Sequence, residues 1–235
     1  MKQFKALVFF LVTASFSASS QTLDEIINKH LDAMGGKEKL KTLNSLIMQA
    51  SLSVQGNDIP LTMTQVHNKG QRVDISLMGM DNYVIQTPTE GWQFFPIQGQ
   101  ASPEATPAEV LKETEAALDI QSPLLDYAQK GHSAELLQKE DVEGVECFKI
   151  KIITRGGMEM TFFIDPSNYY IIKAITKTKA SGQEQEQVQT FSDFRKLESG
   201  YVFPYSMTGF GPGNLTITDI KVNPQVDEGV FKKPG

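Results

Sequence analysis

The chain has 235 residues, of which 40% are hydrophobic, and its 22 basic and 28 acidic residues give a formal net charge of −6 at pH 7. A chain this acidic is not expected to bind nucleic acid or to adhere electrostatically to anionic lipid. The lone cysteine, Cys147, excludes an intramolecular disulfide, and its apolar surroundings predict a small buried hydrophobe rather than a nucleophile.

The first 20 residues have the pattern of a secretory signal peptide. Lys2 and Lys5 precede an apolar run at 6–16, and small residues follow as far as Ser20. That run is too short for a membrane-spanning helix, which needs roughly 20 apolar residues. The residue directly after the expected cleavage site is Gln21 and not a cysteine, so no lipid-modified N-terminus is expected. We therefore predict an exported protein with a signal peptide at 1–20 and one domain at 21–235.

The domain is predicted to begin with a helix. Thr22 and Glu25 fit a capping box, and apolar residues recur at helical spacing as far as Met34, where two glycines end the helix. His30 falls on the apolar stripe of this helix. We interpret it as a packed side chain rather than a ligand.

From Ser45 onward the hydrophobic period changes to the alternation of strands. Strands are predicted at 46–55, 59–68, 71–78, 81–87 and 91–95, with glycine- and asparagine-containing turns between them. A loop rich in Gln, Ser, Ala and Pro follows. Pro107 then suits the first position of a helix at 107–118, and a second short helix is expected at 123–129. The helical insertion at about 97–131 therefore divides two halves of one sheet.

Strands resume at about Ala134, and the longest hairpin is expected at 157–177. Two apolar runs there flank the turn sequence DPSN at 165–168, and each arm is long for a strand. Further strands are predicted at 143–154, 186–197, 201–210 and 214–222. The sequence therefore predicts a mainly β fold with a single, broad, curved antiparallel sheet.

Motifs that carry chemistry are missing from the sequence. The three histidines show no zinc-binding spacing, and there is no GxSxG elbow, P-loop or GxGxxG after a strand. The glycine-rich stretch at 209–213 is interpreted as a wide turn between strands. We therefore predict no catalytic residue, no metal site and no cofactor.

Several short segments appear in a specific order: FFIDP at 162–166, FSDF at 191–194, GYVFP at 200–204 and IKVNP at 220–224. This series resembles the LolA-like family of periplasmic outer-membrane lipoprotein carriers and sorting proteins, over essentially the whole domain. The resemblance implies an incomplete, open β-barrel of about eleven strands with an N-terminal helix and a helical lid. It also implies a monomer in the periplasm, with an inner-membrane donor protein and an outer-membrane acceptor protein as partners.

The ligand implied by the resemblance is the acyl chains of a lipoprotein or another lipid, held in a hydrophobic cavity. Methionines in the strands suit such a wall because thioethers are flexible and polarizable, although ordinary core packing is the alternative for each of them. The residues expected to line the cavity and the lid are Met48, Leu52, Met63, Trp92, Phe94, Val110, Leu111, Leu118, Met160 and Phe162.

Arg72 is the expected latch of the lid. The resemblance suggests that its guanidinium points inward and donates to carbonyl groups of the loop at 97–105. Strand alternation instead places Arg72 with Asp74 and Ser76, on the face opposite Ile75. A solvent-facing Arg72 paired with an acid of a neighbouring strand is therefore the alternative.

Three functions remain open from the sequence. The first is a carrier of lipoproteins or similar amphiphiles, and the second is a regulatory or structural binding protein that senses lipid. The third is an enzyme whose site is not recognised. Only a carrier should pass its cargo to an acceptor, whereas a cluster of Asp, His and Ser in the cavity would favour an enzyme.

Overall fold

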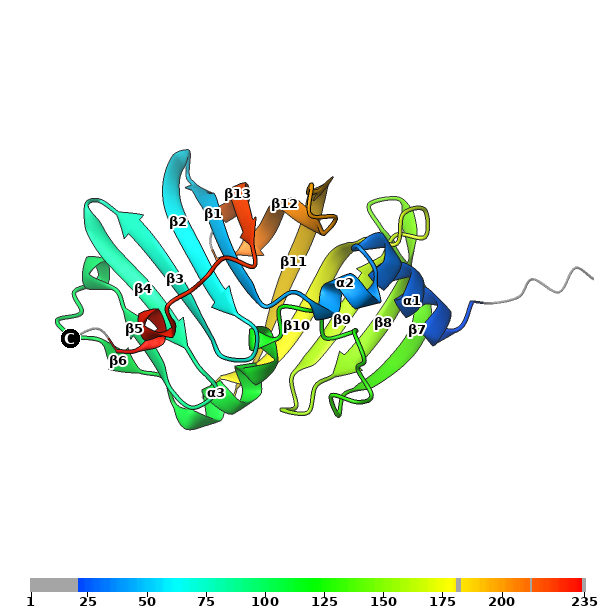
Figure 1. Cartoon of the computed structure of the whole chain (residues 1–235), viewed down its shortest axis with the longest axis horizontal. Helices are drawn as coiled ribbons and strands as arrows, with labels where there is room; N and C mark the ends of the chain where they lie inside the picture. The colour runs from blue at the N-terminus through cyan, green and yellow to red at the C-terminus, as the bar shows by residue number, and fades with distance from the viewer. Residues whose placement is uncertain (1–20, 181–182, 212, 234–235) are drawn as a thin grey trace, which may run out of the picture.

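The computed structural model describes residues 21–180, 183–211 and 213–233, and the expected signal peptide at 1–20 lies outside them. The described chain forms one 13-stranded antiparallel sheet in the order β6-β5-β4-β3-β2-β1-β13-β12-β11-β10-β9-β8-β7. The sheet is curved, and its edge strands β6 and β7 do not pair with each other within this part of the chain (Figure 1). The mainly β fold with an open, barrel-like sheet is confirmed.

The strands agree closely with those expected from the alternation. They are β1 (Ser45–Val54), β2 (Asn57–Val66), β3 (Gly70–Leu77), β4 (Met80–Gln86), β5 (Gly91–Phe94), β6 (Glu104–Ala105), β7 (Ser133–Val142), β8 (Val145–Ile153), β9 (Glu159–Ile164), β10 (Ile171–Ala180), β11 (Gln183–Lys196), β12 (Val202–Phe210) and β13 (Gly213–Val222). Two features differ from expectation. The short strand β6 pairs with β5 inside the expected loop, and β9 is shorter than its expected arm.

The helices are α1 (Leu23–Ala33), α2 (Lys37–Lys41), α3 (Ala108–Thr114) and the 3₁₀ turns η1 (Pro96–Gln98), η2 (Glu115–Leu118) and η3 (Glu228–Phe231). The capping box of Thr22 and Glu25 is present at the start of α1. The helix expected at 107–118 forms as α3 followed by η2. The second helix expected at 123–129 is wrong, because the segment consists of turns with Asp126 at φ 49°, which a right-handed helix does not accommodate.

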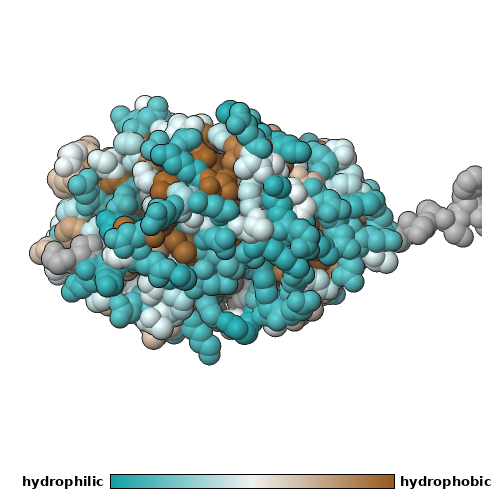
Figure 2. All heavy atoms as spheres, in the orientation of Figure 1, coloured by the Kyte–Doolittle hydropathy of each residue, from teal (hydrophilic) through white to brown (hydrophobic). Residues whose placement is uncertain are grey.

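The two faces of the sheet bury different apolar clusters. On the inner face, Leu46, Met48, Ala50 and Leu52 of β1 are buried in the main core, against which the apolar stripe of α1 also packs. Hydrophobic residues reach the face seen in Figure 2 mainly in a patch near β1 and β2, and most of that face is hydrophilic. The main apolar core of the sheet lies on its inner face.

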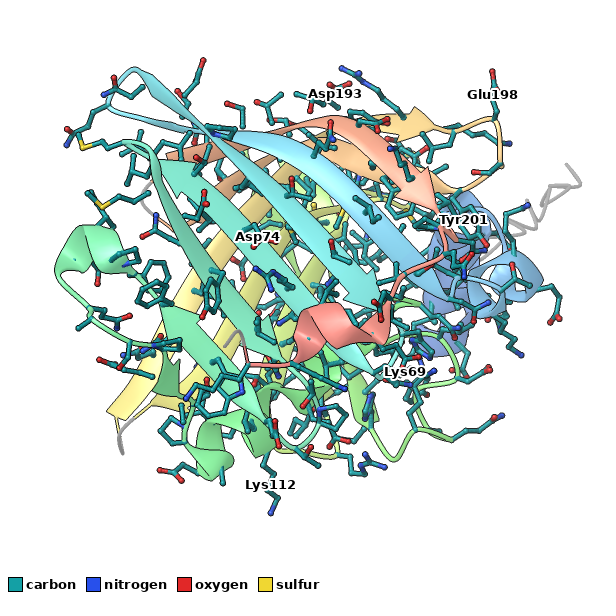
Figure 3. The ribbon with its side chains drawn as sticks, turned by 60° about the vertical axis from the view of Figure 1, so that its left-hand side comes forward. Lys69, Asp74, Lys112, Asp193, Glu198 and Tyr201 are labelled. Atoms are coloured by element: carbon teal, nitrogen blue, oxygen red, sulfur yellow. The ribbon has the colours of Figure 1, made fainter. Side chains whose placement is uncertain are left out.

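The outer face carries a smaller cluster that the sequence did not predict. The chain returns after β13 and lays η3 across the outer face of the sheet at β3 (Figure 3). Phe231 of η3 packs there with Tyr83 and Ile85. A Cβ at Gly70 would lie only 2.7 Å from the Phe231 ring, so a glycine is required where η3 meets β3.

Cys147 confirms its expected role as a buried hydrophobe. Its side chain is fully buried in a separate apolar cluster that includes Val142 and Phe163. Burial raises the pKa of its thiol to about 11, which keeps it protonated at neutral pH.

Candidate functional site

An apolar pocket of about 270 Å³ lies on the inner face, between α1 and α2 on one side and strands β9 to β12 on the other. The segment 119–122, which follows η2, forms a third side of this apolar pocket. Its larger apolar side chains include Leu31, Met34, Leu43, Phe162, Phe191 and Phe203. The pocket can therefore bury a hydrocarbon ligand away from water.

Local backbone structure explains how these side chains reach one space. Leu31 and Met34 are three residues apart on α1, and this spacing puts both on one helix face. Phe191 and Phe194 of β11 are also three residues apart, a separation that would put them on opposite faces of a regular strand. Asp193, between them, has φ 53°, which interrupts the alternation, and both phenylalanines line the pocket.

A buried ion pair holds the 119–122 segment in place. The Asp119 side chain is only 8% exposed and accepts from Nζ of Lys130 at 2.5 Å and from the backbone N–H of Gln121 at 3.1 Å. Lys130 also donates to the carbonyl oxygen of Ser122 at 2.9 Å, and Nδ1 of His67 lies 3.5 Å from Asp119. These contacts fix the segment that closes one side of the apolar pocket.

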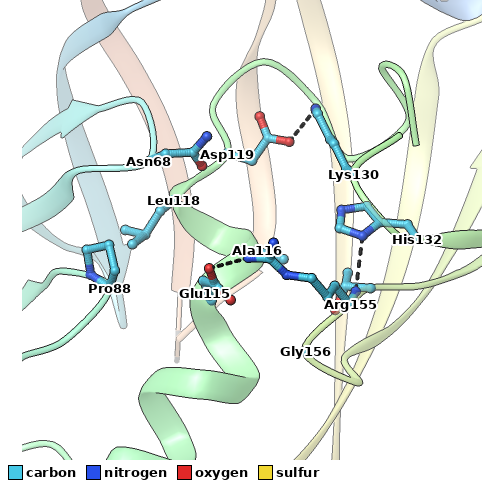
Figure 4. A pocket seen from close by; sticks show the side chains of 11 residues that line it. Asn68, Pro88, Glu115, Ala116, Leu118, Asp119, Lys130, His132, Arg155 and Gly156 are labelled. Atoms are coloured by element: carbon cyan, nitrogen blue, oxygen red, sulfur yellow. Dashed lines mark hydrogen bonds and ion pairs between the residues drawn. The ribbon is translucent and has the colours of Figure 1, made fainter. Parts of the chain in front are cut away.

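A second pocket, polar and of about 290 Å³, lies beside Asp119 (Figure 4). Its charged side chains are paired: Lys130 contacts Asp119, and Nη2 of Arg155 donates to Glu115 at 2.6 Å. Nδ1 of His132 accepts from the backbone N–H of Arg155 at 3.1 Å. This polar pocket therefore holds balanced charges with no excess of either sign among the residues that line it.

His30 is a polar residue in the apolar pocket. It is 3% exposed, and its Nδ1 donates to the carbonyl oxygen of Tyr169 at 2.8 Å. Burial lowers the pKa of the His30 imidazole more than the Tyr169 hydrogen bond raises it, so the ring is neutral at pH 7. A backbone carbonyl only accepts, which places the proton on Nδ1.

Acid is expected to destabilise the protein through this histidine. Its pKa lies below the ordinary 6.5 in the folded state, so the unfolded chain binds more protons and the free energy of unfolding decreases as the pH falls below about 6.5. Burial also lowers the pKa values of His67 and His132, with the same sign. Urea unfolding between about pH 7 and pH 5 measures the slope, which should be shallower in His30→Gln. An equal slope in this variant would contradict the assignment to His30.

The expected cavity residues fall into three places. Phe162 lines the apolar pocket. Met48 and Leu52 are buried in the main core, and Met63 and Met160 pack half-buried against it. The expected lid residues lie outside the apolar pocket, since Leu118 lines the polar pocket, Leu111 is buried and Val110 is half-buried.

Trp92 and Phe94 require a correction. They were expected in the inner cavity, but they pair with Ile85 and Tyr83 and pack in the outer-face cluster with Phe231. Residues directly opposite in a ladder share a face, so both aromatic rings lie on the outer face. Both rings are half-buried because η3 covers this part of the outer face.

The partner expected for Arg72 also requires a correction. Its guanidinium pairs with Asp74, with Nη2 at 2.7 Å, and Nη1 donates to the carbonyl oxygen of Val230 at 3.1 Å. The guanidinium also lies 5.1 Å from the centre of the Tyr83 ring. Arg72 therefore ties η3 to the outer face and makes no hydrogen bond to the loop at 97–105 within the described chain.

The main pocket residues that sequence reasoning missed are His30, Leu31, Phe191, Phe194 and Phe203. Their signal was present, because the first two belong to the apolar stripe of the first helix and the others lie in the segments FSDF and GYVFP. Those segments indicated the fold and were not assigned to the cavity.

Two further findings concern the described residues only. No group of three or more His, Cys, Asp or Glu side chains there could hold a metal ion. None of the helices in the same part of the chain is long and apolar enough to cross a membrane.

Comparison with known proteins shows similarity in structure alone. No protein-family model and no curated protein matches the sequence. A LolA superfamily protein from Nitrosomonas europaea superposes with a TM-score of 0.57 at 13% identity, covering 91% of this chain and 99% of that chain. A DUF1329 family protein from Desulfovibrio piger gives 0.54 at 12% identity, with coverages of 91% and 98%. An outer-membrane lipoprotein-sorting protein domain from Vibrio parahaemolyticus gives 0.50 at 12% identity, with 88% and 94%. The chain has a LolA-like fold.

Proposed function

We propose that the protein is a periplasmic carrier that binds the acyl chains of lipoproteins, or of a similar amphiphile, and delivers them toward the outer membrane. The observation that carries this proposal is the apolar pocket on the inner face of a LolA-like sheet. The Vibrio parahaemolyticus structure with the same fold is known as a putative outer membrane lipoprotein-sorting protein domain. The signal at 1–20 would export the chain, and an inner-membrane donor and an outer-membrane acceptor would be its partners.

The size of the apolar pocket sets how much ligand it holds without rearrangement. Its 270 Å³ is at the lower end of ligand pockets, which span about 300–1,000 Å³. A long acyl chain therefore needs more room than the closed pocket offers. Half-buried apolar side chains that pack against the main core, such as Met63, Met160 and Met207, provide an adaptable wall for the remainder.

The insertion at 97–131 is proposed to be the lid that provides this room. A ladder of amide hydrogen bonds runs from Gln65 through Gln71 to Gln86, whose Nε2 donates to Oγ1 of Thr114 at 2.8 Å. Leu111 of α3 packs against Gly91. Hydrogen bonds of this kind contribute about 0.5–1.5 kcal/mol each. The lid can therefore open by breaking these contacts one after another.

An enzyme is less well supported, although His30, Asp119 and Ser122 all line the apolar pocket. A nucleophile and base act through a hydrogen bond between them. Here no hydrogen bond joins the three side chains: His30 donates to a backbone carbonyl, Asp119 accepts from Lys130, and Ser122 Oγ accepts from a backbone N–H.

Filling the apolar pocket should weaken acyl binding. Ile171 is half-buried and lines the pocket, so in Ile171→Trp the larger ring occupies the ligand's space. We expect the Kd for a fluorescent palmitoyl probe to rise about tenfold or more. The matched control is Val188→Trp, since Val188 is 43% exposed on the same sheet and outside the pocket. Equal binding by the two variants would contradict the site.

Carrying and sensing are separated by a transfer assay. Ligands extracted from protein purified from its native periplasm and identified by mass spectrometry should contain long acyl chains. A carrier should then release this cargo to outer-membrane fractions, whereas a lipid sensor would retain it. Absence of acyl species from the purified protein would count against both.

A further inference from the structure

The apolar pocket contains one polar atom of His30 that has no partner in the protein. Nδ1 of His30 is engaged by the Tyr169 carbonyl, and Nε2 makes no hydrogen bond within the described chain. The ring is 3% exposed, and the fully buried unpaired side-chain atoms of the described chain lie elsewhere, at His67, Asn82 and Trp92, so Nε2 keeps some surface open to the pocket. A ligand that fills the pocket removes water from Nε2, so it must offer a donor in its place or leave this atom unpaired at a cost in free energy.

The other polar side chains that line the pocket each make at least one hydrogen bond within the described chain. The hydroxyl of Tyr201 lies 2.8 Å from the Thr42 hydroxyl, and the Gln121 amide donates to the carbonyl of Lys41 at 3.0 Å. Asp119 accepts from Lys130, and Ser122 Oγ accepts from a backbone N–H. Nε2 of His30 is therefore a ring nitrogen that is open to a donor from the ligand.

The chemistry of this position follows from the tautomer. Because Nδ1 carries the proton, Nε2 presents a lone pair and accepts. An ester carbonyl, which also only accepts, would meet it lone pair to lone pair. An ionised carboxylate would also offer no donor, and its charge would lose hydration in an apolar space.

We propose that the ligand places a hydrogen-bond donor, the O–H of an alcohol or the N–H of an acyl amide, against Nε2 of His30. His30 is then a specificity-determining residue that selects apolar chains with a donor at the head over esters without one. This inference rests on the proposed function, since it concerns the same apolar pocket.

The test uses three probes with the same hydrocarbon chain: hexadecanol, palmitamide and methyl palmitate. Displacement of a fluorescent acyl probe gives the Kd of each for the mature chain. Hexadecanol, palmitamide or both should bind about tenfold more tightly than methyl palmitate, because the ester leaves Nε2 unpaired. The alcohol and amide compared with each other distinguish O–H from N–H as the preferred donor.

Substitution of His30 should remove the selectivity. In His30→Leu the three Kd values should converge, whereas the control His132→Leu should keep the preference because His132 lies in the polar pocket. Circular dichroism checks the fold of both variants. Because His30→Leu also loses the Tyr169 hydrogen bond, a measurement on the unaltered protein is needed as well.

Nitrogen NMR of the ¹⁵N-histidine-labelled protein provides this measurement. The Nε2 resonance of His30 should shift on saturation with the tighter-binding donor probe and remain near its original position with methyl palmitate. Equal affinity of the wild type for all three probes would overturn the role of His30 and leave the acyl pocket intact. Failure of every probe to bind would overturn the proposed function and this inference together.

Discussion

Replacing Asp119 with alanine is expected to lower the free energy of unfolding by about 2–3 kcal/mol, because it leaves the ammonium group of Lys130 without its partner. Removing one member of a fully buried pair costs about 3–5 kcal/mol, and Lys130 is 25% exposed, so part of that cost is relieved by water. The backbone N–H of Gln121 also loses its acceptor. Urea unfolding monitored by circular dichroism measures the change.

Two further variants identify the cause of this loss. Adding Lys130→Met to Asp119→Ala removes the unpaired charge and should restore part of the stability. The control Glu115→Ala breaks an ion pair with Arg155 whose side chains are 40% and 68% exposed, and it should cost less than about 1 kcal/mol. Equal losses for Asp119→Ala and Glu115→Ala would show that burial of the pair contributes nothing.

Replacing Gly209 with alanine is expected to be the most damaging of the glycine substitutions. A Cβ there would lie 1.9 Å from the carbonyl oxygen of Val188, and backbone in the paired strand β11 cannot rotate away as a flexible side chain would. Gly209 also has φ +73°, which alanine adopts with strain. We expect a loss of at least about 3 kcal/mol, combining strain with forced strand displacement.

Gly211 provides a matched control for Gly209 in the same hairpin. It has φ +66°, but no atom lies within 4 Å of its added Cβ. Gly211→Ala should therefore cost only the conformational strain, about 1–2 kcal/mol. Thermal unfolding of both variants measures the difference, and similar melting temperatures would mean that β11 and β12 separate without cost.

Alternation predicted strands such as β1 and β13 well because each of them buries one side more deeply than the other. Alternation does not identify the inner side of a strand when both of its sides are covered. In β5, Trp92 and Phe94 form an apolar row that any core would accept, and the deciding contact comes from Phe231, far away in the sequence. Trp92 and Phe94 were assigned to the wrong face because the segment that covers them is distant in the sequence and leaves no trace in the local hydrophobic pattern.

The pocket was harder to predict than the sheet. Its wall joins α1, the 119–122 segment and several strands, and the positive φ of Asp193 alters which residues of β11 face inward. Neither the crossing of distant segments nor an irregular backbone angle can be deduced from hydrophobic period. The capping box at Thr22 was predictable because its partners lie within one helical turn.

The pairing of β1 with β13 has a consequence for how the protein reaches its native state. These two strands come from opposite ends of the described chain, yet they are hydrogen-bonded neighbours within the sheet. Contacts between distant segments require closure of a long loop, which slows folding. The two halves of the sheet can join only after β13 has been synthesised. We therefore expect the β13 side of β1 to stay unpaired until this last strand is available, which makes completion of the sheet a late step in folding.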